Sequence, residues 1–542
     1  MSVVTSSLVI RNGTVYDPAN GIDGEKMDLF IENGKMVEET RGREIDASGL
    51  VVFPGGIDIH SHIAGSKVNL GRLFRPEDHR KDHVSRTHLT RSGVGYSVPT
   101  TFVTGYRYAK LGYTTIMEAA SPPLMTRHTH EELNDTPIVD KACYTLMGNN
   151  HFVMDYIKKG EMEKLRDYVA WLLNATKGYA VKIVNPGGVE NWKWGRNVES
   201  IDDKVDNYEV TPREILVGLS RVNDDLGLPH AIHVHANNLG SPGNYETTLQ
   251  TMDAVKGRMH LTHLQFHSYA GDSWAKFSSG VDEVVKSVDK HDNITCDMGQ
   301  VIFGDTTTMT ADGPWQHRLY GLTGNKWFNA DVEMETGAGV VPYYFTRKSP
   351  VNSVQWAIGL EIALMVKDPW KVCLTTDHPN GGPFYMYPKV ISWLMSKKAR
   401  DQTLGSIHKA ASARTALPSL DREYSLYDIA IVTRAAQARA LGLKNKGHLG
   451  VGADADVAIY EFAEDHVQRS FSKTRYTIKE GRVVAVNGEI VDSFQGRTFW
   501  ADAQGGVTDE VREAFAKYYT VSFENYPVQD DYLPRAEAVP CG

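Results

Sequence analysis

In the middle of the chain, short apolar runs alternate with longer stretches in which apolar and polar residues are mixed. Eight of the runs have the length and apolar content of buried strands, and helix-compatible sequence follows them. They are VVFPGGIDIH, YTTIMEA, ACYTLMG, AVKIVN, HAIHVHAN, MHLTHLQF, NITCDMG and VCLTTD. Strands that alternate with helices favour a parallel sheet, and eight such units can close into a barrel. The predicted fold class is therefore α/β, with a (β/α)8 TIM-like barrel.

Both ends of the chain follow another pattern, in which β-rich runs alternate apolar and polar residues between glycine-containing turns. LVIRNGTVYDP and REIDASGLVVFPG near the start share this texture with GHLGVGADADVAIYEF and TRYTIKEGRVVAVNGEIV near the end. We expect the two ends to form one discontinuous, small β-sandwich domain. The predicted division is a sandwich of residues 1–54 and 430–495, a barrel of residues 55–429 and a polar C-terminal tail of residues 496–542.

Composition and charge exclude several classes of protein. The 58 lysines and arginines against 67 aspartates and glutamates leave a net charge of -9, which does not favour a nucleic-acid binder. The four cysteines are scattered, so neither a disulfide framework nor a Cys-x-x-Cys site is predicted. No signal peptide and no apolar stretch of about 18 residues is found. We therefore expect a cytoplasmic protein without nucleic-acid or membrane partners.

Histidines gather at the ends of the predicted strands. Because side chains alternate along a strand, His60 and His62 share one face of the first strand. His233 and His235 do the same in HAIHVHAN, and His263 follows in the next run. Each of these histidines alone could be a structural residue. Seventeen of the twenty histidines lie between residues 60 and 378, however, and neutral imidazole is a good ligand for zinc and similar metals.

Two charged residues complete this pattern. Lys182 lies within the apolar run AVKIVN, where a buried ammonium would be costly. It could reach the strand end or pair with a carboxylate, or it could react as a neutral amine with carbon dioxide to form a carbamate, an anionic ligand that bridges two cations. Asp377 ends the eighth run, where it could cap a helix or bind a metal and transfer protons.

This order of ligand types, two His, one Lys, two His and one Asp, resembles the amidohydrolase superfamily, in the branch with a bridging carboxylysine. Within it the chain is most similar to the family of catalytic A subunits of formylmethanofuran dehydrogenase and of the bacterial formyltransferase/hydrolase complex. The resemblance spans nearly the whole chain. It is carried by RPEDHRKDH, SVPTTFVTGYRYAKLGYTTIMEAA, HANNLGSPGNYETTLQT, HLTHLQFHSYAGD and TTDHPNGGPF.

The resemblance implies two divalent metal ions, which we expect to be Zn²⁺, bridged by N6-carboxylysine at Lys182. It implies one metal on His60, His62 and Asp377, and the other on His235 and His263. His235 is preferred over His233 because HVHANN is similar to the strand-five His-Ala-Glu of hydantoinases, although Asn237 replaces the glutamate here.

The resemblance also implies the activity, a hydrolysis of the formyl amide of a methanofuran- or methylofuran-type carrier to formate and the free amine, in either direction. Asp377 would take a proton from the attacking water and return it to the leaving amine. Other subunits of a formyltransferase/hydrolase or formylmethanofuran dehydrogenase complex are the implied partners. Without clustered cysteines, this chain is assigned no redox role.

A basic segment after the first strand suggests where such a carrier could bind. SKVNLGRLFRPEDHRKDHVSRTHLTRS contains Arg72 and Arg75, and arginine forks match the carboxylates of a glutamate-rich carrier. The segment could equally be a solvated surface. Asn238 and His267 are further candidate substrate-binding residues.

Other functions remain open at this point. A cyclic-amide hydrolase of the dihydropyrimidinase or hydantoinase type would use the same metal site and would hydrolyse hydantoin or dihydrouracil. A scaffold without metal could keep the fold, although all six ligand types are present here. The carrier could also be bound as a swinging arm within a larger complex.

Overall fold

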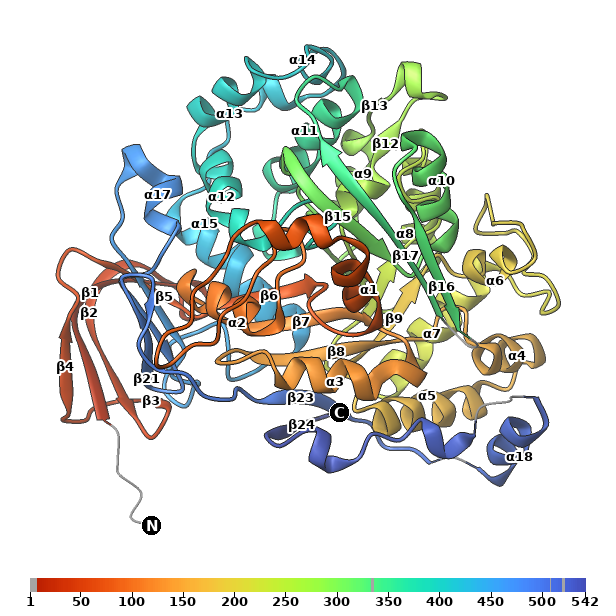
Figure 1. Cartoon of the computed structure of the whole chain (residues 1–542), viewed down its shortest axis with the longest axis horizontal. Coiled ribbons are helices and arrows are strands. Elements are labelled where there is room, and N and C mark those ends of the chain that lie inside the picture. The colour runs from red at the N-terminus through yellow and green to blue at the C-terminus, as the bar shows by residue number, and fades with distance from the viewer. Residues whose placement is uncertain (1–6, 333–335, 507, 519–521) are drawn as a thin grey trace.

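Eight parallel strands form the centre of the molecule (Figure 1). The computed structural model describes residues 7–332, 336–506, 508–518 and 522–542. The barrel strands are β6 (Gly56–Ser61), β7 (Tyr113–Ser121), β8 (Asp140–Leu146), β9 (Ala180–Val184), β10 (Ile232–His235), β11 (Met259–Leu261), β14 (Ile294–Asp297) and β18 (Val372–Cys373). A parallel bridge between Ser61 and His378 brings the first and last strands together, so that the barrel is nearly closed. This confirms the predicted α/β barrel, and each of the eight predicted runs overlaps one barrel strand, although the first run also includes residues 51–54, which form a strand of another sheet.

Helices cover the outside of this barrel, most of them with one apolar face turned inward, whereas α11 is buried on all sides along most of its length. The covering helices are α2 (Thr101–Lys110), α3 (Thr126–Asn134), α4 (His151–Lys159), α5 (Met162–Thr176), α7 (Pro212–Asp225), α8 (Tyr245–Ala254), α9 (Val281–Lys290), α11 (Pro350–Met365), α12 (Tyr387–Met395) and α16 (Ala436–Leu441). Within α9, for example, Val281, Val284, Val285 and Val288 are buried while the polar positions face outward. None of the helices in the described part of the chain is both long and apolar enough to cross a membrane.

Strands from both ends of the chain form a separate mixed sheet, drawn in red and blue in Figure 1. Its members are β1 (Ser7–Asp17), β2 (Ile22–Glu32), β3 (Lys35–Val37), β4 (Arg43–Asp46), β5 (Val51–Pro54), β19 (Val457–Tyr460), β20 (Tyr476–Lys479), β21 (Arg482–Val486) and β22 (Glu489–Ile490). The two ends meet where β5 pairs antiparallel with β19. The predicted small domain made from both termini is therefore present, while its residue boundaries stay a prediction.

Two further parts of the fold surround the barrel. A three-stranded antiparallel sheet, with β15 (Gly304–Thr310), β17 (Thr336–Phe345) and β16 (Phe328–Val332), lies with α10 (Gly313–Thr323) between β14 and β18 in the chain. The predicted polar tail contains β23 (Thr498–Asp502), which pairs with β8, and β24 (Ala536–Pro540), which extends the barrel sheet. Helix α18 (Asp509–Tyr518) places Phe515 against Phe152 of α4.

Candidate metal centre

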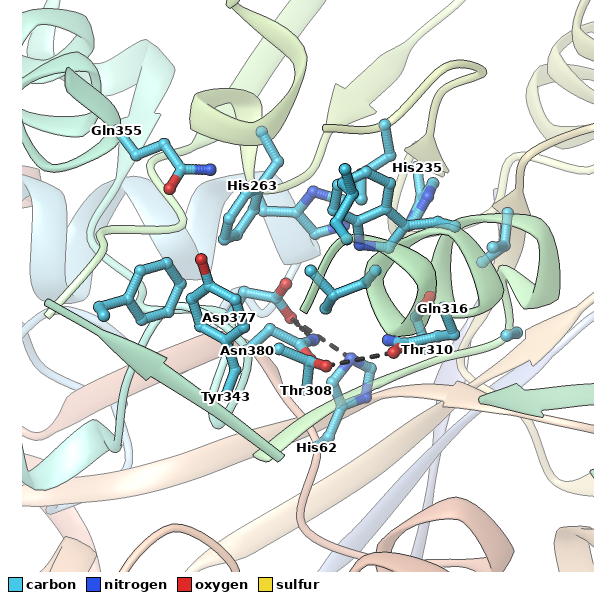
Figure 2. Close-up of a pocket in the computed structure, with 18 of the residues that line it drawn as sticks. His62, His235, His263, Thr308, Thr310, Gln316, Tyr343, Gln355, Asp377 and Asn380 are labelled. Atoms are coloured by element: carbon cyan, nitrogen blue, oxygen red, sulfur yellow. Dashed lines mark hydrogen bonds and ion pairs between the residues drawn. The ribbon is translucent and has the colours of Figure 1, made fainter. Parts of the chain in front are cut away.

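One large cavity opens at the carboxyl ends of the barrel strands, where barrel enzymes place their active sites. It has a volume of about 280 Å³, and its floor is made by residues of β6, β9, β10 and the segments after β11 and β18 (Figure 2). The six residues that the sequence predicts as ligands all line it: His60, His62, Lys182, His235, His263 and Asp377. Strands that are distant in sequence thus bring the predicted residues together.

His60, His62 and Asp377 form the first group in this floor. The Nε2 atom of His60 lies 2.9 Å from Oδ1 of Asp377, and Nε2 of His62 lies 3.3 Å from the same oxygen. All three side chains are buried. Asn380 donates a hydrogen bond to Oδ1 of Asp377 over 2.9 Å and so fixes the carboxylate. Burial raises the pKa of Asp377 above its ordinary value, and the contact with His62 opposes this effect.

Lys182 projects from β9 into the same floor. Its side chain is buried, and within the described part of the chain its Nζ has no hydrogen-bond partner. Burial lowers the pKa of this amine to about 7, so much of it is uncharged at neutral pH. A buried amine without a hydrogen-bond partner is available for reaction when it is uncharged.

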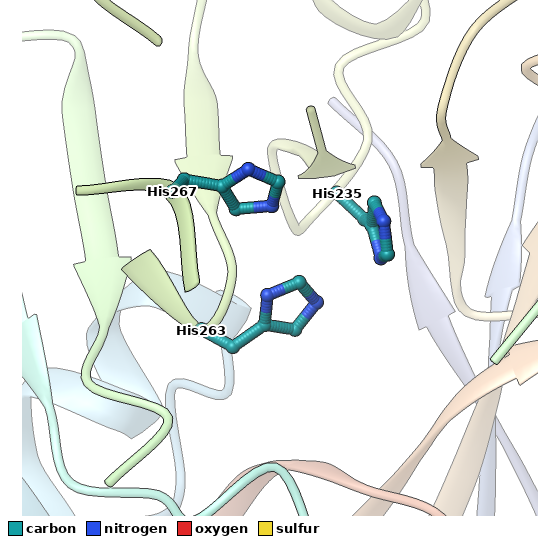
Figure 3. A group of neighbouring side chains, drawn as sticks. All are labelled: His235, His263 and His267. Carbon is teal, nitrogen blue, oxygen red and sulfur yellow. The ribbon is translucent and has the colours of Figure 1, made fainter. Parts of the chain in front are cut away.

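His235, His263 and His267 form a second group (Figure 3). The ring of His235 lies at a centroid distance of 4.8 Å from that of His263 and 5.3 Å from that of His267. Both ring nitrogens of His267 and Nδ1 of His263 are buried and bond to no residue of the described chain. Desolvation lowers the pKa values of all three rings. His267, predicted as a substrate contact, thus lies beside a predicted ligand pair.

Hydrogen bonds behind the floor hold the first histidine pair. Glu118, at the end of β7, accepts from Nδ1 of His62 over 3.4 Å and from the ammonium of Lys67 over 2.7 Å. It also accepts from the backbone amides of Ile63 and Ala64. The nearby charge of Lys67 contributes most to lowering the pKa of Glu118 to about 2, against the effect of burial. Glu118 was not predicted from the sequence, although a glutamate inside the apolar run YTTIMEAA was the available signal.

The donor set fits a pair of divalent transition metals. Imidazoles, one carboxylate and one buried amine converge on the cavity floor, and several of their polar atoms have no partner among the described residues. Leaving such atoms without a partner costs free energy in a folded protein. A bound cation would satisfy these atoms, since each offers a lone pair.

The walls of the cavity are mostly apolar. Trp315 comes from α10, Tyr343 and Phe345 from β17, and Leu239 and Phe266 from the segments after β10 and β11. Thr308, Gln316 and Asn380 add hydrogen-bonding groups near the floor (Figure 2). Thr308, Tyr343 and Phe345 escaped prediction because the sheet that carries them was itself not predicted.

The remaining predicted substrate-binding residues lie away from this cavity. Asn238 borders a smaller neighbouring cavity and donates to the carbonyl of Glu199. Arg72 donates to Glu132 over 2.8 Å, and Arg75 donates to Asp305 over 2.7 Å. Their side chains are only 11% and 5% exposed. The carboxylates of the chain itself therefore neutralise both guanidinium groups, and neither arginine lines the cavity.

Comparison with known proteins gives matches along almost the entire chain. Residues 43–485 match the Amidohydrolase family. Protein FwdA of Methanocaldococcus jannaschii is 52% identical, and the A subunit of the formyltransferase/hydrolase complex Fhc of Methylorubrum extorquens is 35% identical, each over 97% of both chains. The crystal structure of the Methylorubrum extorquens FhcABCD complex with methylofuran contains a chain that superposes with a TM-score of 0.92 at 34% identity, covering 99% of this chain and 100% of that one.

Proposed function

The chain belongs to the amidohydrolase family and is a homologue of FwdA and of the Fhc A subunit, and on this premise we propose that it interconverts an N-formylated methanofuran- or methylofuran-type amine and water with formate and the free amine. The observation that carries this proposal is the convergence of six metal-binding groups on the floor of one apolar-walled cavity. A homologue solved with methylofuran supports the choice of carrier. Because the homologous Fhc A subunit belongs to the FhcABCD complex, we propose that this chain also works within a multi-subunit complex.

The proposed ligand set is divided between two metal positions. His60, His62 and Asp377 would hold one ion, and His235 and His263 would hold the other, with Lys182, as N6-carboxylysine, the ligand that they would share. We expect the ions to be Zn²⁺ because imidazole is the main donor. Two bound cations supply Lewis acidity toward the amide carbonyl and acidify the attacking water.

Formation of the bridge needs only the chemistry of Lys182 and dissolved carbon dioxide. The uncharged Nζ attacks the carbon of CO₂, a nitrogen–carbon bond forms, and one proton leaves, so that an anionic carbamate replaces a neutral amine. The lowered pKa of about 7 supports this step, since an ordinary lysine is almost wholly protonated at that pH. The carbamate also removes the cost of burying an ammonium ion.

Asp377 carries the proton in the proposed reaction. It accepts a proton from water as the oxygen–carbon bond forms at the formyl carbon, and it returns this proton to the amine nitrogen as the carbon–nitrogen bond breaks. Its Oδ1 lies in the cavity floor between the two histidines of the first group, and its raised pKa favours proton uptake there. The reverse sequence of the same transfers forms the amide from formate and amine.

The test is formate release from the formylated carrier by the purified protein, together with any subunits that co-purify, alongside a Lys182→Ala variant. We expect about two metal ions per chain in the parent and the loss of both metal and activity in the variant. Metal without formate release would move the assignment to another amide, with hydantoin and dihydrouracil as the next substrates to test. If the parent protein contains no metal, the remaining interpretation is a metal-free scaffold with the same fold.

A further inference from the structure

Two histidines that the proposed site does not use continue from His60 into the barrel interior. Nδ1 of His60 lies 2.8 Å from Nε2 of His233, and Nδ1 of His233 lies 3.0 Å from Nε2 of His230. Nδ1 of His230 lies 2.5 Å from the carbonyl oxygen of Ala440. The three rings therefore form one hydrogen-bonded row from the cavity floor to helix α16. We propose that this row sets the tautomer of His60 and so positions it as a metal ligand.

The direction in which the hydrogen bonds of the row are donated follows from its last contact, with the carbonyl of Ala440. Ala440 lies in the last turn of α16, where helix carbonyls lack a following amide, and a carbonyl can only accept. Nδ1 of His230 must then carry the proton, which leaves its Nε2 as an acceptor for the Nδ1–H of His233. By the same rule, Nε2 of His233 accepts from the Nδ1–H of His60. The lone pair of His60 is thereby on Nε2, the atom that faces Asp377 at 2.9 Å.

The row lies enclosed in the barrel interior. All three rings are buried, and within the described chain neither His230 nor His233 makes a hydrogen bond to a carboxylate. The ring of His233 packs at 4.7 Å against the rings of both Tyr144 and His260. Burial lowers the pKa of His230 to about 3. Thr262 also contacts Nδ1 of His60, where its hydroxyl oxygen can share the same proton.

The two histidines of the first group thus have different supports. His62 is backed by the charged Glu118, whereas His60 is backed by neutral imidazoles. A carboxylate behind a ligand imidazole makes it more basic, and a neutral acceptor does so less. The row therefore orients His60 without adding another negative charge to a site that already holds Asp377 and the proposed carbamate.

This inference rests on the proposed role of His60 as a metal ligand, and matched substitutions test it. Leucine at position 233 or 230 removes the hydrogen bonds. Glutamine at the same positions keeps one donor and one acceptor, so it can continue the row in the same direction. Zn²⁺ affinity is measured by chelator competition on the purified full-length chain with its co-purifying subunits. His233→Leu and His230→Leu should each lose about 10- to 100-fold in affinity, whereas the glutamine variants should retain most of it.

His130→Leu is the control, because this buried histidine donates to the carbonyl of Thr176 and lies outside the row. It should lower thermal stability without changing Zn²⁺ affinity. Leucine variants at 230 and 233 that bind Zn²⁺ like the parent, or glutamine variants as weak as the leucine ones, would overturn the row's positioning role. A His60→Ala variant with the parental metal content would instead overturn the ligand assignment itself.

Discussion

At the scale of single residues, several buried polar atoms of the site, among them Nζ of Lys182 and Nδ1 of His263, find no hydrogen-bond partner within the described chain. Lys182, Asp377 and the paired histidines could be picked out from sequence as candidate ligands, because charged or polar residues in apolar strands need an explanation. Which nitrogen of each imidazole faces the cavity could not be predicted, since that depends on neighbours such as Glu118 and His233. The partners of Arg72 and Arg75 could not be predicted, because the sequence shows the charge of a residue but not the group that it pairs with in the fold.

Glu118 should control metal binding through His62. Glu118→Gln leaves the shape of the side chain but weakens its hold on the His62 ring and leaves Lys67 without its anion. We expect a loss of about 10- to 100-fold in metal affinity, measured by chelator competition. Glu132→Gln breaks the ion pair with Arg72 outside the cavity and should leave metal affinity unchanged. Equal affinities in the Glu118→Gln variant and the parent would contradict the prediction.

Carbamate formation at Lys182 should depend on pH. The amine reacts only when uncharged, so in metal-free protein the carbamate signal from ¹³C-labelled bicarbonate should rise as the pH increases through about 7. Because the pKa is lower in the folded chain than in the unfolded one, the unfolded chain binds more protons above pH 7. The metal-free protein without carbon dioxide should therefore gain stability as the pH rises from about 7 toward 10. A signal that persists in Lys182→Ala would assign the carbamate elsewhere.

At the scale of elements, the barrel strands were predictable because each is a compact apolar run with helical sequence between. The sheet of β15, β16 and β17 was missed because runs such as GDTTTMT contain few apolar residues. The strands of the tail were missed for a similar reason, since β23 and β24 are short and join the barrel sheet only through β8. The strands that form the cavity floor were therefore predictable, and much of the cavity wall was not.

The packing of α10 on the segment after β10 should determine carrier affinity. A Cβ on Gly240 would lie 2.2 Å from the indole of Trp315, and this glycine also has φ of +71°. Gly240→Ala should push Trp315 from its place in the cavity wall and raise KM for the formylated carrier about tenfold, equivalent to about 1.4 kcal/mol, with little change in kcat. Gly321→Ala in α10 meets no atom and serves as the control. A change in kcat alone would contradict this role.

At the scale of the whole molecule, a buried ion network joins the barrel to the small sheet. Oδ2 of Asp140, in β8, lies 2.7 Å from Nζ of Lys446, 2.8 Å from Nζ of Lys479 in β20 and 2.9 Å from Nη2 of Arg497. Asp454 and Asp456 complete the cluster. Lys35 also pairs with Asp454, so four cations surround the three carboxylates, and the cluster is an ion network and not a second metal site. The network connects parts of the chain that are more than 300 residues apart in sequence.

Removing one charge from this network should destabilise the protein strongly. Asp140→Asn leaves buried cations without their shared anion and should lower the free energy of unfolding by about 3 to 5 kcal/mol in urea denaturation. Asp155→Asn removes a carboxylate that pairs with Lys159 on the surface of α4, and should change the free energy of unfolding by only about 0 to 1 kcal/mol. Similar small effects of both substitutions would show that the network adds little to the attachment of the small sheet.

The pairing of β5 with β19 also has a consequence for synthesis on the ribosome. Val52 lies opposite Ile459, so one edge of β5 has no partner until about 400 further residues have been made. At roughly 5 to 20 residues per second, this takes on the order of 20 to 80 s. During that time the nascent chain exposes an apolar strand edge that could pair with other chains. Newly made protein should therefore depend on chaperones for longer than a chain whose first domain is contiguous.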